Sequence, residues 1–545
     1  MKVKDRLVGE VHGVLVSSLC VTAILAAALI PATPAQARLI RIIHTNDMHA
    51  HLEPHLDSKE DIFTGGYAEV RGTIEALQLQ AQAEGIEALT LDAGDFSEGS
   101  IFYLADQGFR TFQLMGNMKF DAVAFGNHDW MLGRKKLEKM MKKLPADYKV
   151  LAANYRAEKS QPETNQRVDA YTILQRAGLR IGILGLTTDQ ILYSWIIRGL
   201  TSPFPIWDPL LTARLYLPEL RKKTDMVIAL THIGLDQDKT LAHSTGDIDV
   251  IVGGHSHDLL PTPIIAYNKK SHPVPIVQAG KHGEYVGELT VDFEPGQAAR
   301  VISYRLVRVN SQAPKNPEIA QQVAAVREAI YETYDRSWMT ETVGHSDVPI
   351  SIVGEGGAEW SELLVEAMRA SSPNGDAADL ALDVPEFAGA RQPAGSVTRE
   401  NLFNLYPRLF GQYNEPLGWT VWVVKTWGGL LEVALKVAVK FGYTFATSGA
   451  DIEVIRKPDG STHVGKVLIG GEKIKRTRMY RLALPEGIAR GAFGISRALA
   501  VILKNPKNTG VPIWSATEQE IKRRGGLVRR QELRSFQIVN PGGIR

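Results

Sequence analysis

Short, continuously apolar segments alternate with amphipathic segments between about Arg38 and Asn310. Continuous apolar runs of this length are typical of strands that are buried on both faces. We predict strands at Ile40–Ile43, Ala88–Leu91, Ala122–Phe125, Val150–Ala152, Arg180–Leu186, Met226–Leu230, Val250–Val252 and Pro275–Gln278. We predict helices at Tyr67–Ala83, Phe109–Lys119, Arg134–Leu144 and Leu210–Lys223. The pattern therefore predicts an α/β fold with helices packed on a mixed sheet.

The chain after this region follows a different pattern. Asn316-Pro317 is a good helix start, because Asn caps and Pro suits the first helical position. Apolar residues follow at helical spacing, namely Ile319, Val323, Val326, Ile330 and Tyr334. We predict a linker helix within 313–338, between a first domain at 38–312 and an α+β domain at 339–545. In the second domain we predict helices near Ser361–Ala370 and Gly428–Val439. We expect Glu518–Arg534 to be solvated, with a helix break at Gly525-Gly526.

The N-terminus has the pattern of an export signal. Basic residues precede the uncharged run Val14–Ile30, and the segment ends in Ala-Gln-Ala37. This pattern predicts a secretory signal peptide at 1–37, cut after Ala37, and therefore export to the periplasm or cell exterior. An uncleaved anchor helix is the alternative, because the apolar run is long. After cleavage, no stable membrane insertion is expected.

Composition limits the possible partners and chemistry. The chain has 545 residues, of which 44% are hydrophobic and 22% charged, as in soluble globular proteins. Its net charge of +2 gives no reason to expect a nucleic acid polymer or an anionic membrane as partner. The single cysteine, Cys20, lies in the signal. A mature chain without cysteine excludes disulfides and thiolate chemistry.

Five predicted strands run directly into metal-ligand residues. In open α/β sheets, ligands gather beyond the carboxyl ends of strands. Extended backbone would place residues i and i+2 on one side, so each pair in Asp47-Met-His49 and His255-Ser-His257 would face one pocket. The candidate ligands are Asp47, His49, Asp95, Asn127, His232, His255 and His257. Seven ligands fit two divalent ions that share a carboxylate, and the mixture of His, Asp and Asn suits Zn, Mn, Fe or Co.

These blocks resemble the calcineurin-like metallophosphoesterase superfamily and, within it, the exported two-domain 5'-nucleotidases of bacteria. The matching residues are Asp47-x-His49, Gly94-Asp95, Gly126-Asn127-His128-Asp129, His232 and Gly254-His255-Ser-His257. The resemblance is strong from about Leu39 to Phe293. It implies a four-layer α/β/β/α first domain and a substrate-binding second domain.

The resemblance also implies roles for individual residues. Asp47, His49, Asp95 and His257 would hold one ion, and Asp95, Asn127, His232 and His255 the other. His128 would act as a catalytic residue beside the phosphate. In relatives, a carboxylate three residues after this histidine orients it, but Met131 stands there. Of the other nearby histidines, His51 and His55 are expected in a surface loop.

In the resembled family, the second domain binds the nucleoside. Arg391 matches the family's substrate arginine, and Phe410 is a candidate stacking ring. Other positions depart from the family pattern: Phe493 replaces the ribose-binding Asp, and no aromatic residue stands near Gly487. A pocket without that Asp and ring should bind a nucleoside poorly.

The sequence thus predicts an exported metal-dependent phosphoric ester hydrolase, with a small phosphate ester, expected to be a nucleotide, as substrate. Two alternatives stay open. The same chemistry could act on a non-nucleotide, a cyclic phosphodiester or a thiosulfonate-type substrate, or the chain could be a non-catalytic secreted binding protein. The sequence does not determine the oligomeric state.

Overall fold

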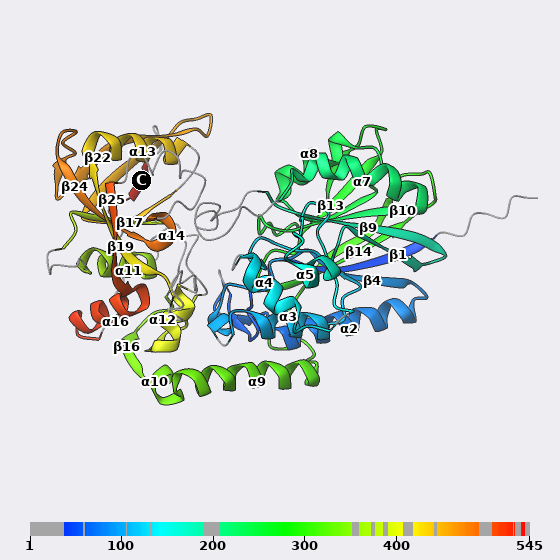
Figure 1. Ribbon diagram of the computed structural model, residues 1–545, viewed down its shortest axis with the longest axis horizontal. Helices are drawn as coiled ribbons and strands as arrows, with labels where there is room; N and C mark the ends of the chain where they lie inside the picture. Colours follow the sequence, from blue (N-terminus) through cyan, green and yellow to red (C-terminus); the bar gives the residue numbers. More distant parts are fainter. Residues whose placement is uncertain are drawn as a thin grey trace, which may run out of the picture. The chain divides into compact units, whose positions relative to one another are not determined.

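The computed structural model describes residues 38–545 except 58–59, 105, 131–132, 146, 190–205, 351–358, 372–376, 385–390, 407–417, 441–443, 490–503, 527, 529–535 and 540–545 (Figure 1). The predicted signal peptide at 1–37 lies outside the described residues. Among the described residues, no helix has the length and apolar character needed to cross a membrane.

The first sheet of the N-terminal part contains five strands in the order β15-β14-β1-β4-β5. Their bounds are β1 Leu39–Thr45, β4 Glu87–Asp92, β5 Ala122–Val123, β14 Tyr285–Asp292 and β15 Arg300–Arg308. β1 runs parallel to β4 and antiparallel to β14, so Ile42 lies between Leu89 and Leu289. The last two strands, β14 and β15, were not predicted from the sequence.

The second sheet contains six strands in the order β12-β13-β11-β10-β9-β8. Their bounds are β8 Tyr171–Arg176, β9 Leu179–Thr187, β10 Met226–His232, β11 Val250–Gly253, β12 Ile264–Tyr267 and β13 Pro273–Val277. The strands β9, β10, β11 and β13 are parallel neighbours. Their carboxyl ends therefore lie on one edge of the sheet.

The two sheets pack face to face and are covered by helices on their outer faces (Figure 1). Ile42 and Leu91 of the first sheet share a core with Ile183 and Leu230 of the second. Helices α2 (Tyr67–Ala83) and α3 (Phe109–Asn117) share a core with the outer face of the first sheet. Helices α7 (Pro209–Lys223) and α8 (Leu235–Ser244) cover the second. The predicted four-layer α/β/β/α arrangement is confirmed, and the mixed sheet expected from the apolar pattern is present as two mixed sheets.

Smaller elements complete the N-terminal part. They are β2 (His55–Leu56), β3 (Phe63–Thr64), the 3-10 helix η1 (Ile101–Leu104), α4 (Arg134–Met141), β6 (Val150–Leu151), α5 (Pro162–Arg167) and β7 (Val168–Asp169). Helix α9 (Pro317–Tyr334) then follows, and the Asn316 side chain accepts a hydrogen bond from the Ile319 N–H (3.0 Å). The predicted cap is therefore present. The domain boundaries at 312 and 338 stay predictions.

The C-terminal part combines a five-stranded sheet, β20-β17-β24-β19-β25, with a four-stranded sheet, β23-β22-β21-β26. The strands of the larger sheet are β17 (Leu380–Asp383), β19 (Thr420–Trp427), β20 (Ala446–Ser448), β24 (Met479–Pro485) and β25 (Lys504–Pro512). Those of the smaller are β21 (Ala450–Arg456), β22 (Thr462–Ile469), β23 (Glu472–Lys473) and β26 (Phe536–Val539). A separate pair joins β16 (Thr342–Ser346) to β18 (Gly395–Thr398).

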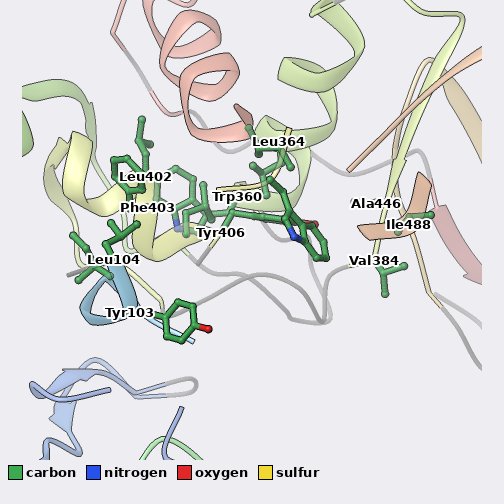
Figure 2. Close-up of a cluster of buried hydrophobic side chains, with 14 of the residues drawn as sticks. Tyr103, Leu104, Trp360, Leu364, Val384, Leu402, Phe403, Tyr406, Ala446 and Ile488 are labelled. Atoms are coloured by element: carbon green, nitrogen blue, oxygen red, sulfur yellow. The ribbon is translucent and has the colours of Figure 1, made fainter. Parts of the chain in front are cut away.

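The helices of this part are α10 (Arg336–Thr340), α11 (Glu359–Ala370), α12 (Arg399–Leu405), α13 (Gly428–Lys440), α14 (Glu486–Ala489) and α16 (Ile513–Arg523). Part of the core is shown in Figure 2, where Trp360 and Leu364 of α11 and Phe403 of α12 are among the buried side chains.

One prediction for the C-terminal part is wrong. Glu518 and Glu520 were expected to be solvated, yet both are buried. Glu518 accepts two hydrogen bonds from Arg399, and Glu520 pairs with Arg523 and Arg524. Ion pairing therefore compensates for the burial of these carboxylates.

Candidate metal centre

The seven candidate ligands lie together beyond the ends of β1, β4, β5, β10 and β11, and we call them the strand-end cluster. Three groups place their ligand atoms within 4.8 Å of one another. These groups are Asp47–His49–His257, His49–Asp95–His128 and Asp95–His232–His255. The first and third groups correspond to the two ion sites that the family resemblance implies.

Asp95 occupies the centre of the strand-end cluster. Its Oδ2 lies 3.0 Å from His232 Nε2 and 3.8 Å from His49 Nε2. Its Oδ1 accepts a hydrogen bond from the backbone N–H of His128 (2.7 Å). A Cβ at Gly126 would lie only 2.0 Å from the same Oδ1, so only glycine fits there. Asp95 therefore belongs to two of the three groups of candidate ligands.

Backbone carbonyls fix the orientation of two histidine rings. Nδ1 of His49 donates to the carbonyl of Glu98 (2.7 Å), and Nδ1 of His232 donates to the carbonyl of Ala93 (2.8 Å). Each bond places the proton on Nδ1 and leaves the Nε2 lone pair for another partner. The Nε2 atoms of His49 and His257 face each other at 3.1 Å. Ligating histidines in metalloproteins are commonly held in this way.

Asn127 supplies an independent sign that cations fit here. Its Oδ1 is buried without a hydrogen-bond partner among the described residues. An orphaned amide oxygen costs roughly 1–3 kcal/mol unless something else satisfies it. Oxygen is a suitable ligand for a divalent ion, so a metal would remove this cost. The donor set therefore fits the two ions predicted from the sequence.

The cluster concentrates negative charge in a buried space. Burial opposes ionisation of Asp47, but the nearby His257 and His232 lower its pKa to about 2. Burial also disfavours the charged form of His232, yet Asp95 and Asp47 raise its pKa to about 10. The two carboxylates thus attract positive charge strongly.

The backbone at the cluster is not extended, contrary to the sequence argument. Asp47, His49, His255 and His257 have φ values of 52°, 47°, 81° and 58°. Asp95 also has a positive φ, 57°. These left-handed conformations are costly for non-glycine residues and occur mostly at functional sites. The side chains of each i, i+2 pair share a pocket because both residues are left-handed, not because they lie on one side of a strand.

His128 has a partner that the sequence argument missed. Its Nδ1 lies 2.6 Å from Glu98 Oε2, and the Glu98 side chain is fully buried. Its Nε2 points toward the cluster, 3.9 Å from Asp95 Oδ2. Glu98 lies three residues after Asp95, on the same turn, and that spacing was the available signal. Met131 lies outside the described residues.

Asp129, which follows His128, accepts hydrogen bonds from backbone N–H groups and does not contact the His128 ring through any of these bonds. Its carboxylate accepts hydrogen bonds from the N–H groups of Asp95, Phe96, Ser97 and Gly126, at 2.8–3.0 Å. These bonds join the loop after β4 to the loop after β5. Asp129 thereby helps to hold Asp95 in its left-handed conformation.

His51 and His55 are not surface residues, so that expectation is wrong. His51 is 5% exposed, and the side chain of His55 is 10% exposed. Both rings pack against His282, which follows β13. The chain after β1 turns inward beneath the loop 279–285, and sequence spacing alone could not show this.

The predicted substrate residues are less well placed. Nη1 of Arg391 pairs with Asp61 Oδ1 (2.8 Å), and the Arg391 backbone forms a bridge with Leu56. Arg391 therefore contacts the loop that carries His55. Phe410 and Phe493 lie outside the described residues. A Cβ at Gly487 would lie 2.0 Å from the Trp419 ring, so no larger side chain fits there.

Residues 40–259 match the family described as calcineurin-like phosphoesterase. The chain contains a calcineurin-like phosphoesterase domain. It is 25% identical to human 5'-nucleotidase over 533 residues, which cover 88% of each chain. The chain spans only about half the length of some other curated relatives, such as a 5'-nucleotidase-related protein from Glossina morsitans morsitans (28% identity) and 5'-nucleotidase from Rattus norvegicus (30% identity). The predicted resemblance to calcineurin-like metallophosphoesterases and 5'-nucleotidases is confirmed, and it supports the predicted class of metal-dependent phosphoric ester hydrolases.

Solved structures support the same fold over nearly the whole chain. A 5'-nucleotidase precursor from Thermus thermophilus has a TM-score of 0.77 and 24% identity, covering 92% of this chain and 99% of that chain. The sulfate thiohydrolase SoxB from Thermus thermophilus has a TM-score of 0.72 and 17% identity, covering 92% and 96%. Because a 5'-nucleotidase precursor and a sulfate thiohydrolase share this fold, the fold alone does not identify the substrate.

Proposed function

We propose that this protein is an exported two-metal phosphohydrolase that releases phosphate from a nucleotide by attack of water. The convergence of the strand-end cluster around Asp95 carries the proposal. Export to the periplasm or cell exterior rests on the signal-like segment 1–37. The proposed hydrolysis rests on the side chains of the strand-end cluster, which lie at the ends of buried strands.

In this proposal, Asp47, His49 and His257 hold one ion, Asn127, His232 and His255 hold the other, and Asp95 bridges them. The ions, whether Zn, Mn or a similar metal, would polarise the phosphoryl group and lower the pKa of water. The protein contributes rigid ligands and a buried, water-poor setting. The groups that stabilise charge in the transition state are therefore already in position before the reaction begins.

His128 is the proposed catalytic acid. Its Nε2 faces the cluster, and Glu98 holds Nδ1 from the other side. A proton on Nε2 would pass to the leaving oxygen of the ester as the P–O bond breaks. Glu98 would hold the His128 ring in the orientation that this transfer needs. Glu98 is a positioning residue in this scheme, because it acts through His128.

The names of the relatives support a nucleotide as substrate, and Arg391 is the proposed anion contact. A guanidinium offers two parallel N–H donors to a phosphate or carboxylate. Asp61 already occupies part of this fork, so substrate would compete with that exposed carboxylate.

A phosphate ester without a nucleoside is the second candidate, and Gly487 favours it. In the resembled family an aromatic ring stacks on the base near this position. Here Trp419 fills the space against Gly487, which leaves no room for such a ring. Stacking contributes about 1–3 kcal/mol per base, so its loss would weaken nucleoside recognition substantially.

A substrate panel tests both candidates on one sample. The purified protein is assayed with 5'-nucleotides, sugar phosphates, a cyclic phosphodiester, a thiosulfonate and an aryl phosphate, and its metal content is measured in parallel. Preference for 5'-nucleotides supports the first candidate, and preference for other phosphate esters supports the second. Metal-loaded protein that hydrolyses no phosphate ester would contradict both, and a metal-poor inactive protein would favour a binding role.

A further inference from the structure

A second group of histidines lies beside the strand-end cluster and takes no part in the mechanism above. We call His51, His55 and His282 the histidine trio. The first two follow β1, whereas His282 lies on the turn between β13 and β14, far along the chain. The ring centroids of His51 and His282 are 3.8 Å apart, and those of His51 and His55 are 4.5 Å apart. One ring nitrogen from each lies within 4.8 Å of the others.

The trio is buried, and several of its nitrogens are unsatisfied. Nε2 of His51 and both ring nitrogens of His55 lack hydrogen-bond partners within the described part of the chain. Each buried, unpaired nitrogen costs roughly 1–3 kcal/mol. Three such atoms from two neighbouring side chains are a large cost to leave uncompensated. A neutral imidazole has one lone pair, so a partner that accepts one lone pair from each ring would remove part of this cost, while the N–H of each ring needs a separate acceptor.

A divalent cation is the partner that meets this need. We propose that His51, His55 and His282 form a further metal site, separate from the strand-end cluster and best suited to Zn²⁺. Zinc binds neutral imidazole nitrogens at about 2.0–2.1 Å, and three histidines are a recurrent zinc ligand set. Tetrahedral zinc would place the ligating nitrogens about 3.3 Å apart, so the rings of the trio would have to turn from their present arrangement. In that arrangement the His51 and His282 rings are stacked.

The surroundings of the trio resemble those of ligating histidines elsewhere. Glu284 Oε1 lies 3.5 Å from His55 Nε2, where a carboxylate would orient the ring and offset part of the ion's charge. Gly65 lets the backbone approach the ring, because a Cβ there would lie 2.9 Å from His55 Cε1. Lys281 lies on the same turn as His282, and its charge opposes cation binding. The site is therefore expected to bind more weakly than the strand-end cluster.

The ion would tie together two loops that also support the strand-end cluster. The backbone N–H of His282 donates to the carbonyl of Asp47 (2.7 Å), and the His282 ring lies 5.9 Å from that of His49. A metal held by the trio would join the chain after β1 to the turn before β14. Its effect would be to stabilise the backbone on which Asp47 and His49 stand.

Metal content of the whole mature chain tests the proposal. Wild type, His55→Gln and the control His345→Gln are stripped with chelator, saturated with Zn²⁺, gel-filtered and analysed for zinc per chain. His345 is half exposed and lies on β16, outside the trio. We expect His55→Gln to hold one ion fewer than wild type and His345→Gln to hold the same number. Equal zinc in His55→Gln and wild type would overturn the proposal.

Two further measurements keep the result clear of folding defects and of the strand-end cluster. Titration of wild type with Co²⁺ should give one more saturating equivalent than the strand-end cluster accounts for, with the absorption of a nitrogen-ligated ion. In an Asp95→Asn background, His55→Gln should still remove one zinc ion. If Asp95→Asn alone already removes all bound metal, the trio holds no ion of its own and the proposal fails, whatever the activity of wild type.

Discussion

The strand-end cluster and the region around Arg391 show two ways of building a functional site. Every ligand of the cluster lies at the end of a buried strand or within a few residues of it, and its position follows from sheets packed face to face. Arg391 instead forms an isolated β-bridge with Leu56, and its side chain pairs with the exposed Asp61. One site is built from the rigid core, and the other from connecting segments.

This difference explains why the chemistry is better defined than the substrate. Residues at strand ends cannot move without disturbing a core, so the ligand geometry is retained while loops vary. The Arg391–Asp61 pair is a local arrangement that ends on an exposed carboxylate. The following predictions test this contrast, beginning with the largest expected effect.

Asp95→Asn should abolish hydrolysis, with a loss on the order of 10³-fold or more in kcat, because a shared carboxylate becomes a neutral amide. Chelation of wild type should have the same effect, reversed by added Mn²⁺ or Zn²⁺. Phosphate release and bound metal are measured together. Asp451→Asn, on the exposed face of β21, is the matched control. Full activity in Asp95→Asn would show that the cluster is not the catalytic centre.

Glu98→Gln should lower kcat by about 10–100-fold with little change in KM or metal content, because Glu98 acts through the His128 ring. The loss should be larger for an alkyl phosphate than for an aryl phosphate, since a poor leaving group needs the proton more. Glu98→Asp should not restore activity fully, because the shorter side chain cannot reach Nδ1 at 2.6 Å. An equal loss for both substrates would argue that Glu98 only supports the fold.

Arg391→Ala should raise KM by about tenfold, which corresponds to the loss of about 1.4 kcal/mol of substrate binding. Asp61→Asn separates this role from a structural one. If Arg391 binds substrate, removal of the competing carboxylate should leave KM unchanged or lower it. If Arg391 only holds Asp61, the two variants should behave alike. Kinetics with the preferred substrate of the panel, with Arg300→Ala as an exposed control, distinguish these outcomes.

The limits of prediction from sequence follow the same contrast. Helix α2 has the predicted bounds, Tyr67–Ala83, because amphipathic spacing is a local property. The apolar runs of β1 and β10 were found for the same reason. Their assignment to two facing sheets was not visible in the pattern, since either arrangement buries both faces of a strand. The family resemblance supplied that distinction.

Within the site, the candidate metal ligands were easier to predict than the residues that contact them. The seven ligands stand at strand ends, where local sequence is informative. Glu98 and the histidine trio depend on how loops fold back, which local spacing does not encode. The extended backbone assumed at Asp47 and His49 was wrong because ligand loops adopt left-handed conformations that strand periodicity does not predict.

The last prediction concerns the stability cost of a buried carboxylate, Asp238 of α8, which contacts β10. Burial raises the pKa of Asp238 to about 7, although its Oδ1 accepts a hydrogen bond from Thr231 (2.6 Å). Unfolded Asp titrates near about 4, so the folded chain binds the extra proton between these values. The associated stability is fully present below about pH 4 and is lost as the pH rises through about 7.

Chelated wild type should therefore lose stability between about pH 4 and pH 7, with a slope from this group of at most about 1.4 kcal/mol per pH unit. Asp238→Asn retains an acceptor for Thr231 but cannot ionise, so its stability should change less over the same interval. Denaturant unfolding at several pH values measures both slopes, and Asp451→Asn should keep the wild-type slope. Parallel slopes in wild type and Asp238→Asn would mean that ionisation of Asp238 does not destabilise the folded chain. That result would weaken the contrast between the rigid core and the connecting segments.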